Sequence, residues 1–517
     1  MIRNPILPGF CPDPSIIRVG DDYYIAVSTF DWWPGVRIYH SKDLEHFEQL
    51  PSPLNRIEQL NMMGNGDSCG VWAPDLTYDG EYFWLIYTND RTRNGNWFNT
   101  HNYLVKTKDI WSGEWSDPVY LNSTGFDPSM LHDTDGKKYV INMINQFKGN
   151  MVQEFDPVKM ELVGEAKNVY PGTGLPFTEG PHIYHIGEYY YLMMAEGGTA
   201  YEHCETMARS KSIWGPYEPS TYNPIVTSDI DNPEALQKCG HADIVQTQNG
   251  EWFLVHLASR PPAGTKLSVL GRETCLENVY WTEDGWLRLK GDGHYGKWQA
   301  EDPVGIEKVL MPEIPTRTEF GKVEKLGVEF SSLRIPAEWY ASLGERPGYL
   351  RIHGQESLNS RFKVSLIARR QTEYLMTAET CVEFQPECPE QMAGLAYMYD
   401  TRNFFILAKT TDEAGRKIIT LTKGNSGDVR LIAEPIYIDA DKLDAPVYFK
   451  AVTFDRGLKV KFYYSLDGEY YIKVAEDTTD ILSDEHTVGF MGAHFGMYCH
   501  DMTGRRKVAD FKYFELK

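Results

Sequence analysis

Apolar and polar positions follow nearly the same pattern in five segments of the first 254 residues. Each segment begins a short apolar strand, reaches a turn containing Gly, Asp or Asn, and returns in a strand rich in Tyr, Phe and Trp. The segments cover 13–25, 73–84, 127–141, 180–191 and 241–254, and their starts are separated by 60, 54, 53 and 61 residues. A hairpin that returns at a nearly constant period indicates a repeat architecture built from β-strands.

The length of the period indicates how many strands each repeat contains. Strands average about 5–6 residues, so one period has room for four strands and their turns. Five repeats of four strands predict a five-bladed β-propeller over residues 1–308. A stack of β-sandwiches is the alternative fold, and it explains the strands but not the regular return of the motif.

Beyond the repeats the pattern changes. Residues 309–324 show no turn–strand unit and are predicted to form a linker. Residues 325–517 continue in strands without the period, and they are predicted to form an antiparallel, concanavalin-like β-sandwich. No long helix is predicted, so the expected fold class is all-β. The strands predicted in the sandwich are 380–384, 394–400, 417–422, 447–454 and 458–465.

Composition narrows the range of partners. The 517 residues carry a net charge of −22 with no basic run, which argues against nucleic acid or an anionic membrane as partner. The eight cysteines have neither zinc-site nor Cys-x-x-Cys spacing. The first residues lack the apolar stretch of a signal peptide, and no apolar segment approaches the ~20 residues of a membrane span. These features predict a reduced, cytoplasmic protein.

Candidate chemistry lies at the starts of the repeats. Asp13, Asp127 and His241 begin three of them, and Glu179 directly precedes a fourth. The first strand of each propeller blade lines the central channel, so these side chains are expected to meet there. Gathering like charges costs free energy unless they share protons or partners. Catalysis therefore explains the cluster better than stability does.

Paired carboxylates flanking a bond are what glycoside hydrolysis requires, one activating water and the other protonating the leaving oxygen. Three other interpretations remain open at this point. Asp-Pro is a common turn dipeptide and could serve only as a strand-entry turn. A propeller with these aromatic residues could also bind carbohydrate without catalysis, or it could be a protein-interaction propeller.

Several motifs together make the chain similar to a known family. They are Asp13-Pro14-Ser15-Ile16, Trp72-Ala73-Pro74-Asp75, Gly125-Phe126-Asp127, Thr178-Glu179-Gly180-Pro181-His182, Cys239-Gly240-His241-Ala242 and Leu270-Gly271-Arg272-Glu273-Thr274. The chain resembles glycoside hydrolase family 43, in particular its two-domain β-xylosidases and α-L-arabinofuranosidases. The resemblance extends through the predicted sandwich.

The resemblance implies roles for the three carboxylates. Asp13 corresponds to the general base, Asp127 to the residue that adjusts the pKa of the acid, and Glu179 to the general acid. The family inverts the anomeric centre in one displacement, so the Asp13 and Glu179 carboxyls are expected about 6.5–9.5 Å apart. The expected activity is exo-hydrolysis of terminal β-D-xylose, α-L-arabinofuranose or both from hemicellulose oligosaccharides. A preference mainly for arabinofuranosyl side chains is the alternative.

The resemblance also implies substrate-binding residues. Phe30 and Trp72 correspond to walls that stack on the sugar, Thr199 to the pocket edge, and Arg272 to an active-site arginine. His241 corresponds to a channel histidine that lies near calcium in some relatives and meets only water in others. No cofactor is expected to be required, and calcium near His241 stays open. The expected partner is a small oligosaccharide, and homo-oligomers are expected only by analogy.

Three differences from the family concern the rim of the pocket. An aromatic-rich insertion with a pocket tryptophan is absent after Asn142-Met143, and the loop at 260–265 is short. Relatives have Gly-Ala-Phe-Val-Gly where this chain has Gly492-Ala493-His494-Phe495-Gly496. Neighbouring residues of a strand face opposite sides. His494 is therefore predicted to face the substrate and Phe495 the sandwich interior, with a more open rim.

Overall fold

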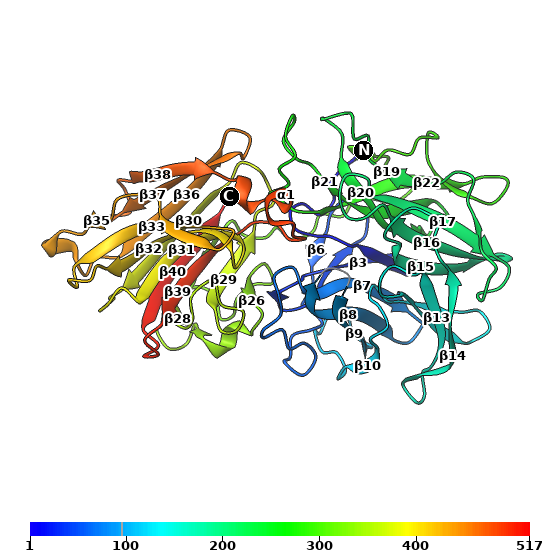
Figure 1. Cartoon of the computed structure of the whole chain (residues 1–517), viewed down its shortest axis with the longest axis horizontal. Coiled ribbons are helices and arrows are strands. Elements are labelled where there is room, and N and C mark those ends of the chain that lie inside the picture. Colours follow the sequence, from blue (N-terminus) through cyan, green and yellow to red (C-terminus); the bar gives the residue numbers. More distant parts are fainter. Residues whose placement is uncertain (95–96) are drawn as a thin grey trace.

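The chain folds into two lobes of β-structure, as Figure 1 shows, with the propeller in blue to green and the sandwich in yellow to red. The computed structural model describes residues 1–94 and 97–517. Nearly all regular elements are strands, and within the described residues the α-helical content is the single turn α1 (Asp484–Thr487). The predicted all-β class, with a five-bladed propeller followed by a sandwich, is confirmed.

Each of the five repeats forms one antiparallel sheet, in chain order from the centre outward. The first two sheets are β2 (Ser15–Val19), β3 (Asp22–Val27), β5 (Arg37–Ser41), β6 (Glu48–Gln49), and β7 (Gly70–Tyr78), β8 (Phe83–Asn94), β9 (Trp97–Thr107), β10 (Val119–Asn122). The third is β11 (Ser129–His132), β12 (Lys138–Met143), β13 (Asn150–Asp156), β14 (Glu161–Tyr170). The fourth is β15 (Glu179–Ile186), β16 (Tyr189–Glu196), β17 (Cys204–Ser210), β18 (Glu218–Pro219), with β19 (Val226–Thr227) also on β17. The fifth is β20 (Gln237–Gln246), β21 (Trp252–Ser259), β22 (Glu273–Trp281), β23 (Leu287–Leu289).

The N-terminal segment closes the ring of blades. Strand β1 (Ile2–Arg3) pairs with β24 (Gln299–Ala300), which follows the fifth blade. The Asn4 side chain donates to the carbonyl oxygens of Leu276 and Lys297, and its Oδ1 accepts from the Leu276 amide. Because Asn4 is fully buried, these bonds attach the start of the chain to the last blade.

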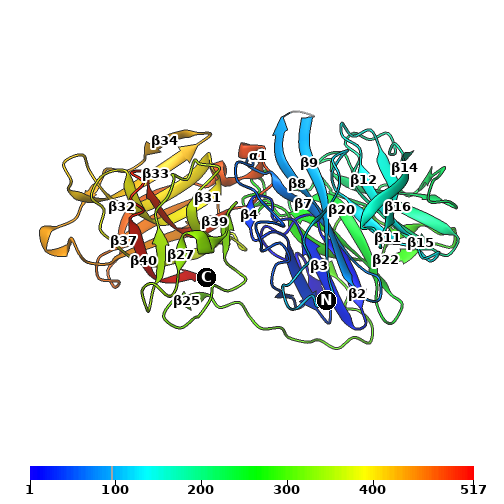
Figure 2. The ribbon, with the colours of Figure 1, turned by 90° about the horizontal axis from the view of Figure 1, so that it is seen from below.

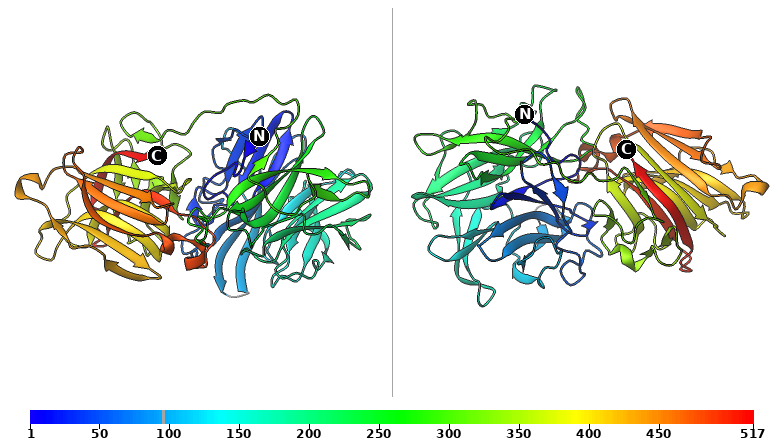
Figure 3. Two further views of the ribbon diagram at one scale, coloured as in Figure 1. Left: turned by 90° about the horizontal axis from the view of Figure 1, so that it is seen from above. Right: turned by 180° about the vertical axis from the view of Figure 1, so that it is seen from behind.

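An extended segment connects the two lobes, visible in Figure 2 as the long trace along the lower side and in the left panel of Figure 3 along the upper side. Lys308 contacts Glu45 and Asp302, and the Val309 amide donates to Asp43 of the first blade. Strand β25 (Arg317–Glu319) lies inside the predicted linker 309–324. It pairs with the last strand of the chain, so the sandwich begins earlier than expected.

Two large antiparallel sheets form the sandwich. One contains β27 (Ala341–Ser342), β28 (Leu350–His353), β40 (Val508–Leu516), β30 (Thr377–Phe384), β36 (Val447–Phe454), β37 (Lys459–Ser465) and β38 (Ile472–Thr478), with β25 on β40. The other contains β34 (Asp428–Leu431), β33 (Lys417–Asn425), β32 (Asn403–Thr411), β31 (Gln391–Asp400), β39 (His494–Asp501), β29 (Ser365–Arg370), β26 (Ser331–Leu333) and β4 (Trp32–Trp33), with β35 (Ile436–Tyr437) on β33. Three 3₁₀ turns complete the lobe: Ala337–Trp339, Ala440–Lys442 and Asp480–Leu482. The alternation of Val447–Phe454, buried at every second position, shows why this sequence forms a strand with one face in the core.

The propeller supplies an edge strand to the sandwich. β4 pairs with β26, so that Trp32 lies opposite Leu333. Arg334 follows at once, is 1 % exposed, and holds Asp31 at 2.6 Å and Asp67 at 2.9 Å. One apolar cluster contains residues of both lobes, including Phe10 and Phe495. The lobes therefore share a core. Within the described residues, no helix is long and apolar enough to cross a membrane.

Candidate active site

A cavity of about 500 Å³ lies at the centre of the propeller and against the sandwich. Its volume falls within the range of about 300–1,000 Å³ typical of small-ligand sites. Eight of the nine residues predicted to contact substrate or perform catalysis line it: Asp13, Phe30, Trp72, Asp127, Glu179, Thr199, His241 and Arg272. The ninth, His494, does not. Residues that the sequence reading missed complete the wall: Arg93, Phe98, Phe126, Phe147, Phe177, Gly198, Val488 and Phe490.

The backbone at the repeat starts has an unusual conformation. Asp13, Asp127 and His241 have φ of 54°, 50° and 50°, and Gly180 has φ of 57°. Positive φ is uncommon for residues with a side chain and is several-fold enriched in Asp and His. The repeated motif thus encodes a repeated left-handed residue. Such strain concentrates at functional sites, where surrounding contacts maintain it.

The Asp13 carboxylate is held by two donors. Ser28 donates to Oδ2 at 2.6 Å and Arg272 donates to Oδ1 at 3.1 Å. Burial by itself would raise the pKa of Asp13, but the charge of Arg272, together with the neighbouring His241 and the Ser28 hydrogen bond, lowers it below its usual value. Asp13 is therefore ionised at neutral pH, as a general base must be.

Glu179 has the opposite electrostatic environment. Burial, followed by the negative charge of Asp13, raises its pKa to about 8. It is 8 % exposed and makes no side-chain hydrogen bond to any described residue, so its proton is available to a ligand in the cavity. A carboxyl that stays protonated at neutral pH beside an ionised one is the pairing that general acid–base catalysis needs.

Asp127 is the third carboxylate of the cavity, and it lies close to Glu179. Burial, followed by the charges of Glu179 and Asp13, raises its pKa well above the usual value, while the Gly180 amide donates to its Oδ2 at 3.0 Å. Because that amide belongs to the residue after Glu179, Asp127 also fixes the backbone that carries Glu179. Its negative charge, when present, disfavours ionisation of Glu179.

Aromatic rings form the cavity wall beside the carboxylates. Phe30 and Trp72 have ring centroids 6.3 Å apart, and Phe126 stands edge-on to Trp72 at 5.2 Å. The Trp72 indole donates to the Ser68 carbonyl at 3.0 Å, which fixes the ring plane. Flat apolar faces of this kind can stack against the C–H faces of a sugar ring.

The sandwich closes the cavity with Phe490, which lies in the loop before β39. Its amide donates to Ser68 and its carbonyl accepts from Arg272, both at 3.1 Å. The Arg93 guanidinium lies over its ring at 4.1 Å and donates to the Val488 carbonyl at 2.9 Å. Two arginines of the propeller thus hold one aromatic residue of the sandwich in place.

Three phenylalanines line the remaining part of the cavity. Phe98 lies 6.1 Å from Phe147, and Phe147 lies 5.0 Å from Phe177, in each case nearly perpendicular. Phe177 is 47 % exposed, so this row opens to solvent. These rings line this part of the cavity. Only their number and aromatic character could have suggested them from sequence.

The prediction for His494 is wrong. Its ring is fully buried and stacks on Trp32 with centroids 3.9 Å apart, and its Nδ1 bonds the Gly492 carbonyl at 2.9 Å. The physical reason is β4: Trp32, on the strand that the propeller inserts into the sandwich sheet, covers the face of β39 that was expected to meet substrate. Phe495 does face the interior, stacked on Tyr397 at 3.9 Å.

The surroundings of His241 do not fit a protein-held calcium ion. Its Nδ1 lies 4.0 Å from Asp13 Oδ1, and that oxygen is already bonded to Arg272. Calcium takes 6–8 oxygen ligands. Among the described residues, the His, Cys, Asp and Glu side chains that converge closely enough to hold a metal are elsewhere and do not include His241. Burial, the largest effect, lowers the pKa of His241 to about 4, so the ring is neutral.

An ionised base, a protonated acid and a stacking wall in one cavity are what a glycoside hydrolase site requires. Comparison with known proteins agrees with this class. The model of glycosyl hydrolases family 43 matches residues 2–287, and that of the β-xylosidase C-terminal concanavalin A-like domain matches residues 317–517. The chain belongs to glycosyl hydrolase family 43.

Full-length relatives support the same assignment. The chain is 43% identical to a β-xylosidase of Bacillus subtilis, with 100% of this chain and 99% of the relative covered. It is 42% identical to xylosidase/arabinosidase 43B of Humicola insolens, over 99% and 97% of the two chains. A xylan β-1,4-xylosidase from Bacillus halodurans has a similar structure, with TM-score 0.96, 45% identity and full coverage of both chains.

Proposed function

We propose that the protein is an exo-acting, inverting glycosidase that releases terminal β-D-xylose, α-L-arabinofuranose or both from short hemicellulose fragments. The observation that supports this best is a pair of opposite pKa shifts. The pKa of Asp13 is lowered, because Arg272 and its other partners outweigh the effect of burial, and the pKa of Glu179 is raised by burial and by the Asp13 charge. The catalytic roles follow from this difference.

The chemistry is a single displacement. Asp13 accepts a proton from a water molecule as the water oxygen attacks the anomeric carbon. Glu179 gives its proton to the glycosidic oxygen as the bond from that oxygen to the anomeric carbon breaks. Water adds from the face opposite the leaving group, so the configuration inverts. Arg272 keeps Asp13 ionised before the reaction, and the Asp13 charge favours the protonated form of Glu179. Asp127 holds the backbone next to Glu179 through the Gly180 amide.

The exo mode of action follows from the closed end of the cavity. Phe490 and Val488 of the sandwich stand against the propeller cavity, and Arg93 joins them to the second blade. A polysaccharide chain cannot continue through this wall. Only a terminal residue then reaches the carboxylates, with the rest of the substrate extending past the exposed Phe177.

The test compares 4-nitrophenyl β-D-xylopyranoside with 4-nitrophenyl α-L-arabinofuranoside in the wild type, Asp13→Ala and Glu179→Ala. Hydrolysis at the wild-type rate by either variant contradicts the assigned roles. Proton NMR of the first product formed from xylobiose reports inversion, and release of internal fragments from xylan contradicts the exo mode.

The main alternative is a preference for α-L-arabinofuranosides. Phenylalanines line the rim of the cavity, and relatives from Humicola insolens and Butyrivibrio fibrisolvens are named for both activities. The ratio of kcat/KM for the two nitrophenyl glycosides decides between them. A ratio above one for arabinofuranoside over xylopyranoside supports the alternative.

A further inference from the structure

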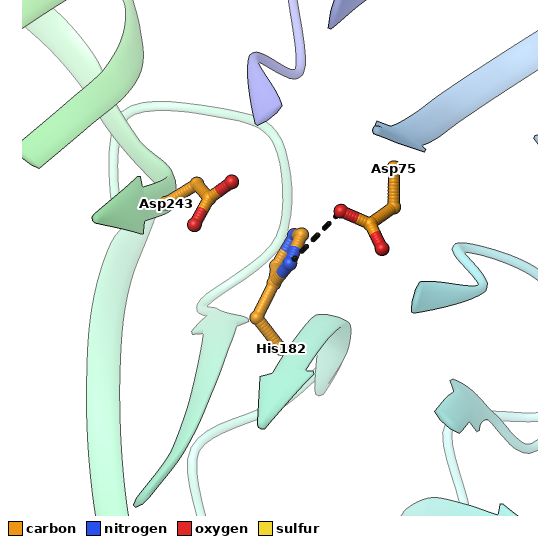
Figure 4. A group of neighbouring side chains, drawn as sticks. All are labelled: Asp75, His182 and Asp243. Carbon is orange, nitrogen blue, oxygen red and sulfur yellow. Dashed lines mark ion pairs between the residues drawn. The ribbon is translucent and has the colours of Figure 1, made fainter. Parts of the chain in front are cut away.

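Three potential metal ligands converge on the inner strands, each two residues after the start of a repeat. Asp75 lies on β7, His182 on β15 and Asp243 on β20. Figure 4 shows the imidazole between the two carboxylates. One ligand atom from each of the three lies within 4.8 Å of the others. Three different blades thus present a nitrogen and two oxygen ligands to one point.

The His182 imidazole has no hydrogen-bond partner among the described residues, although the residue is only 9 % exposed. Its Nδ1 lies 3.7 Å from Asp75 Oδ1, which is beyond hydrogen-bond distance. A buried polar side chain is expected to have a partner. This one points toward two carboxylates without hydrogen-bonding either, and its 3.7 Å contact with Asp75 is the ion pair marked by the dashed line in Figure 4.

Neither carboxylate is paired with a lysine or arginine side chain of the described residues. Asp75 and Asp243 are each 4 % exposed, and no Lys or Arg in the described part of the chain forms an ion pair with either. Two buried carboxylates this close are costly unless a positive charge joins them.

Neighbouring blades orient both carboxylates. The Met130 amide donates to Asp75 Oδ2 at 2.8 Å, and the Ile16 amide donates to Asp243 Oδ2 at 2.7 Å. The Tyr184 hydroxyl also donates to Asp243. Hydrogen bonds that fix ligand orientation are typical of metal sites. A second cavity, about 430 Å³ and sharing no lining residue with the catalytic cavity, provides an entry path.

We propose that Asp75, His182 and Asp243 bind one divalent transition cation of the Mn²⁺ or Zn²⁺ type between the innermost strands of the second, fourth and fifth blades. One imidazole and two carboxylates suit these ions, whereas calcium prefers more oxygen ligands. The ion is structural: it neutralises the two carboxylates and ties three blades together. It takes no part in bond cleavage.

The experiment is isothermal titration of the EDTA-treated protein with MnCl₂, ZnCl₂ and CaCl₂ at about pH 7, where an ordinary imidazole is mainly neutral. The variants are Asp243→Asn and, as a matched control, Asp133→Asn. Asp133 is a buried carboxylate that is hydrogen-bonded to His185 at 2.6 Å. Among the described residues, this pair has no third His, Cys, Asp or Glu close enough to complete a metal site.

We expect one Mn²⁺ or Zn²⁺ per wild-type chain, with calcium weaker. Asp243→Asn weakens binding about tenfold or more, by analogy with the effects of altered metal-site residues, and Asp133→Asn leaves it unchanged. Absence of binding in the wild type overturns the proposal. Equal binding by Asp243→Asn also overturns it.

If Asp243→Asn does not fold, anomalous diffraction from wild-type crystals soaked in MnCl₂ tests the site instead. An anomalous-scattering peak among the three side chains supports the site, and a peak only elsewhere, or none, overturns it. Neither readout depends on activity, so failure of this proposal is distinguishable from failure of the proposed hydrolase function.

Discussion

Replacing Glu179 by Gln removes the proton that the proposed mechanism delivers to the leaving oxygen while keeping the shape of the side chain. Burial and the Asp13 charge raise the pKa of Glu179 from 4.5 to about 8. At pH 7, a carboxyl of ordinary pKa is protonated in about 0.3% of molecules, whereas one with a pKa of about 8 is protonated in about 90%. The cavity therefore increases the active acid form about 300-fold, and the variant loses all of it.

The size of the effect depends on the leaving group. General acid catalysis contributes typically about 10²–10⁴-fold, so we expect kcat on xylobiose to fall by about that factor in Glu179→Gln. Xylosyl fluoride and 2,4-dinitrophenyl xyloside need little protonation, and their hydrolysis stays within about tenfold of wild type. The wild-type pH–rate profile falls as pH rises through about 8, because the acid loses its proton, and this basic limb disappears in the variant.

Glu205→Gln is the matched control. Glu205 is fully buried on β17, does not line the catalytic cavity, and has a pKa that burial raises well above its usual value. The substitution exchanges one neutral side chain for another, so we expect kcat to stay near wild type. An equal loss of activity by Glu179→Gln on xylobiose and on xylosyl fluoride refutes the assignment of Glu179 as the acid.

Further predictions concern the base, the wall and the lobe interface. Arg272→Met removes the cation that lowers the pKa of Asp13, so the acidic limb of kcat/KM moves up by about one unit or more in a pH-rate profile. Phe490→Ala opens the sandwich wall and raises KM about tenfold in steady-state assays. His494→Ala lowers the free energy of unfolding by about 2–4 kcal/mol, measured by denaturant titration, with KM unchanged. Phe177→Ala raises KM for xylobiose severalfold but not for xylosyl fluoride, because only the former has a leaving group long enough to reach the rim. Equal effects on both substrates contradict that placement.

The repeat carried most of the information about the fold. Its period and turn residues indicated five blades, and residues 447–454 were predicted as a strand, which the structure shows to be buried at every second position. These signals are local, because hairpin turns and period-two burial act within a few residues of the chain. The start of the sandwich was harder to place, since β25 is a short strand that exists only through pairing with β40.

The catalytic carboxylates could be identified from sequence because Asp13 and Asp127 begin two of the repeats and Glu179 directly precedes a third. Symmetry of the blades then brings Asp13, Asp127 and Glu179 to one cavity. The protonation states could not be read in the same way. They depend on burial and on Arg272, which is 259 residues from Asp13 in the chain and bonded to it in the fold.

The position of His494 shows where reading a strand in isolation fails. Alternation correctly separated the faces of His494 and Phe495, but it could not say what covers each face. Residues 32–33 of the propeller occupy the edge of the sandwich sheet, and Phe490 of a loop reaches the cavity instead. Blade number and turn positions follow from short-range patterns in the chain, and the roles of the acid and the base were implied by the resemblance of its motifs to the family. The pKa values, the closed end of the cavity and the meeting of Asp75, His182 and Asp243 arise only when distant segments pack, because charge, burial and ligand geometry depend on distances in space.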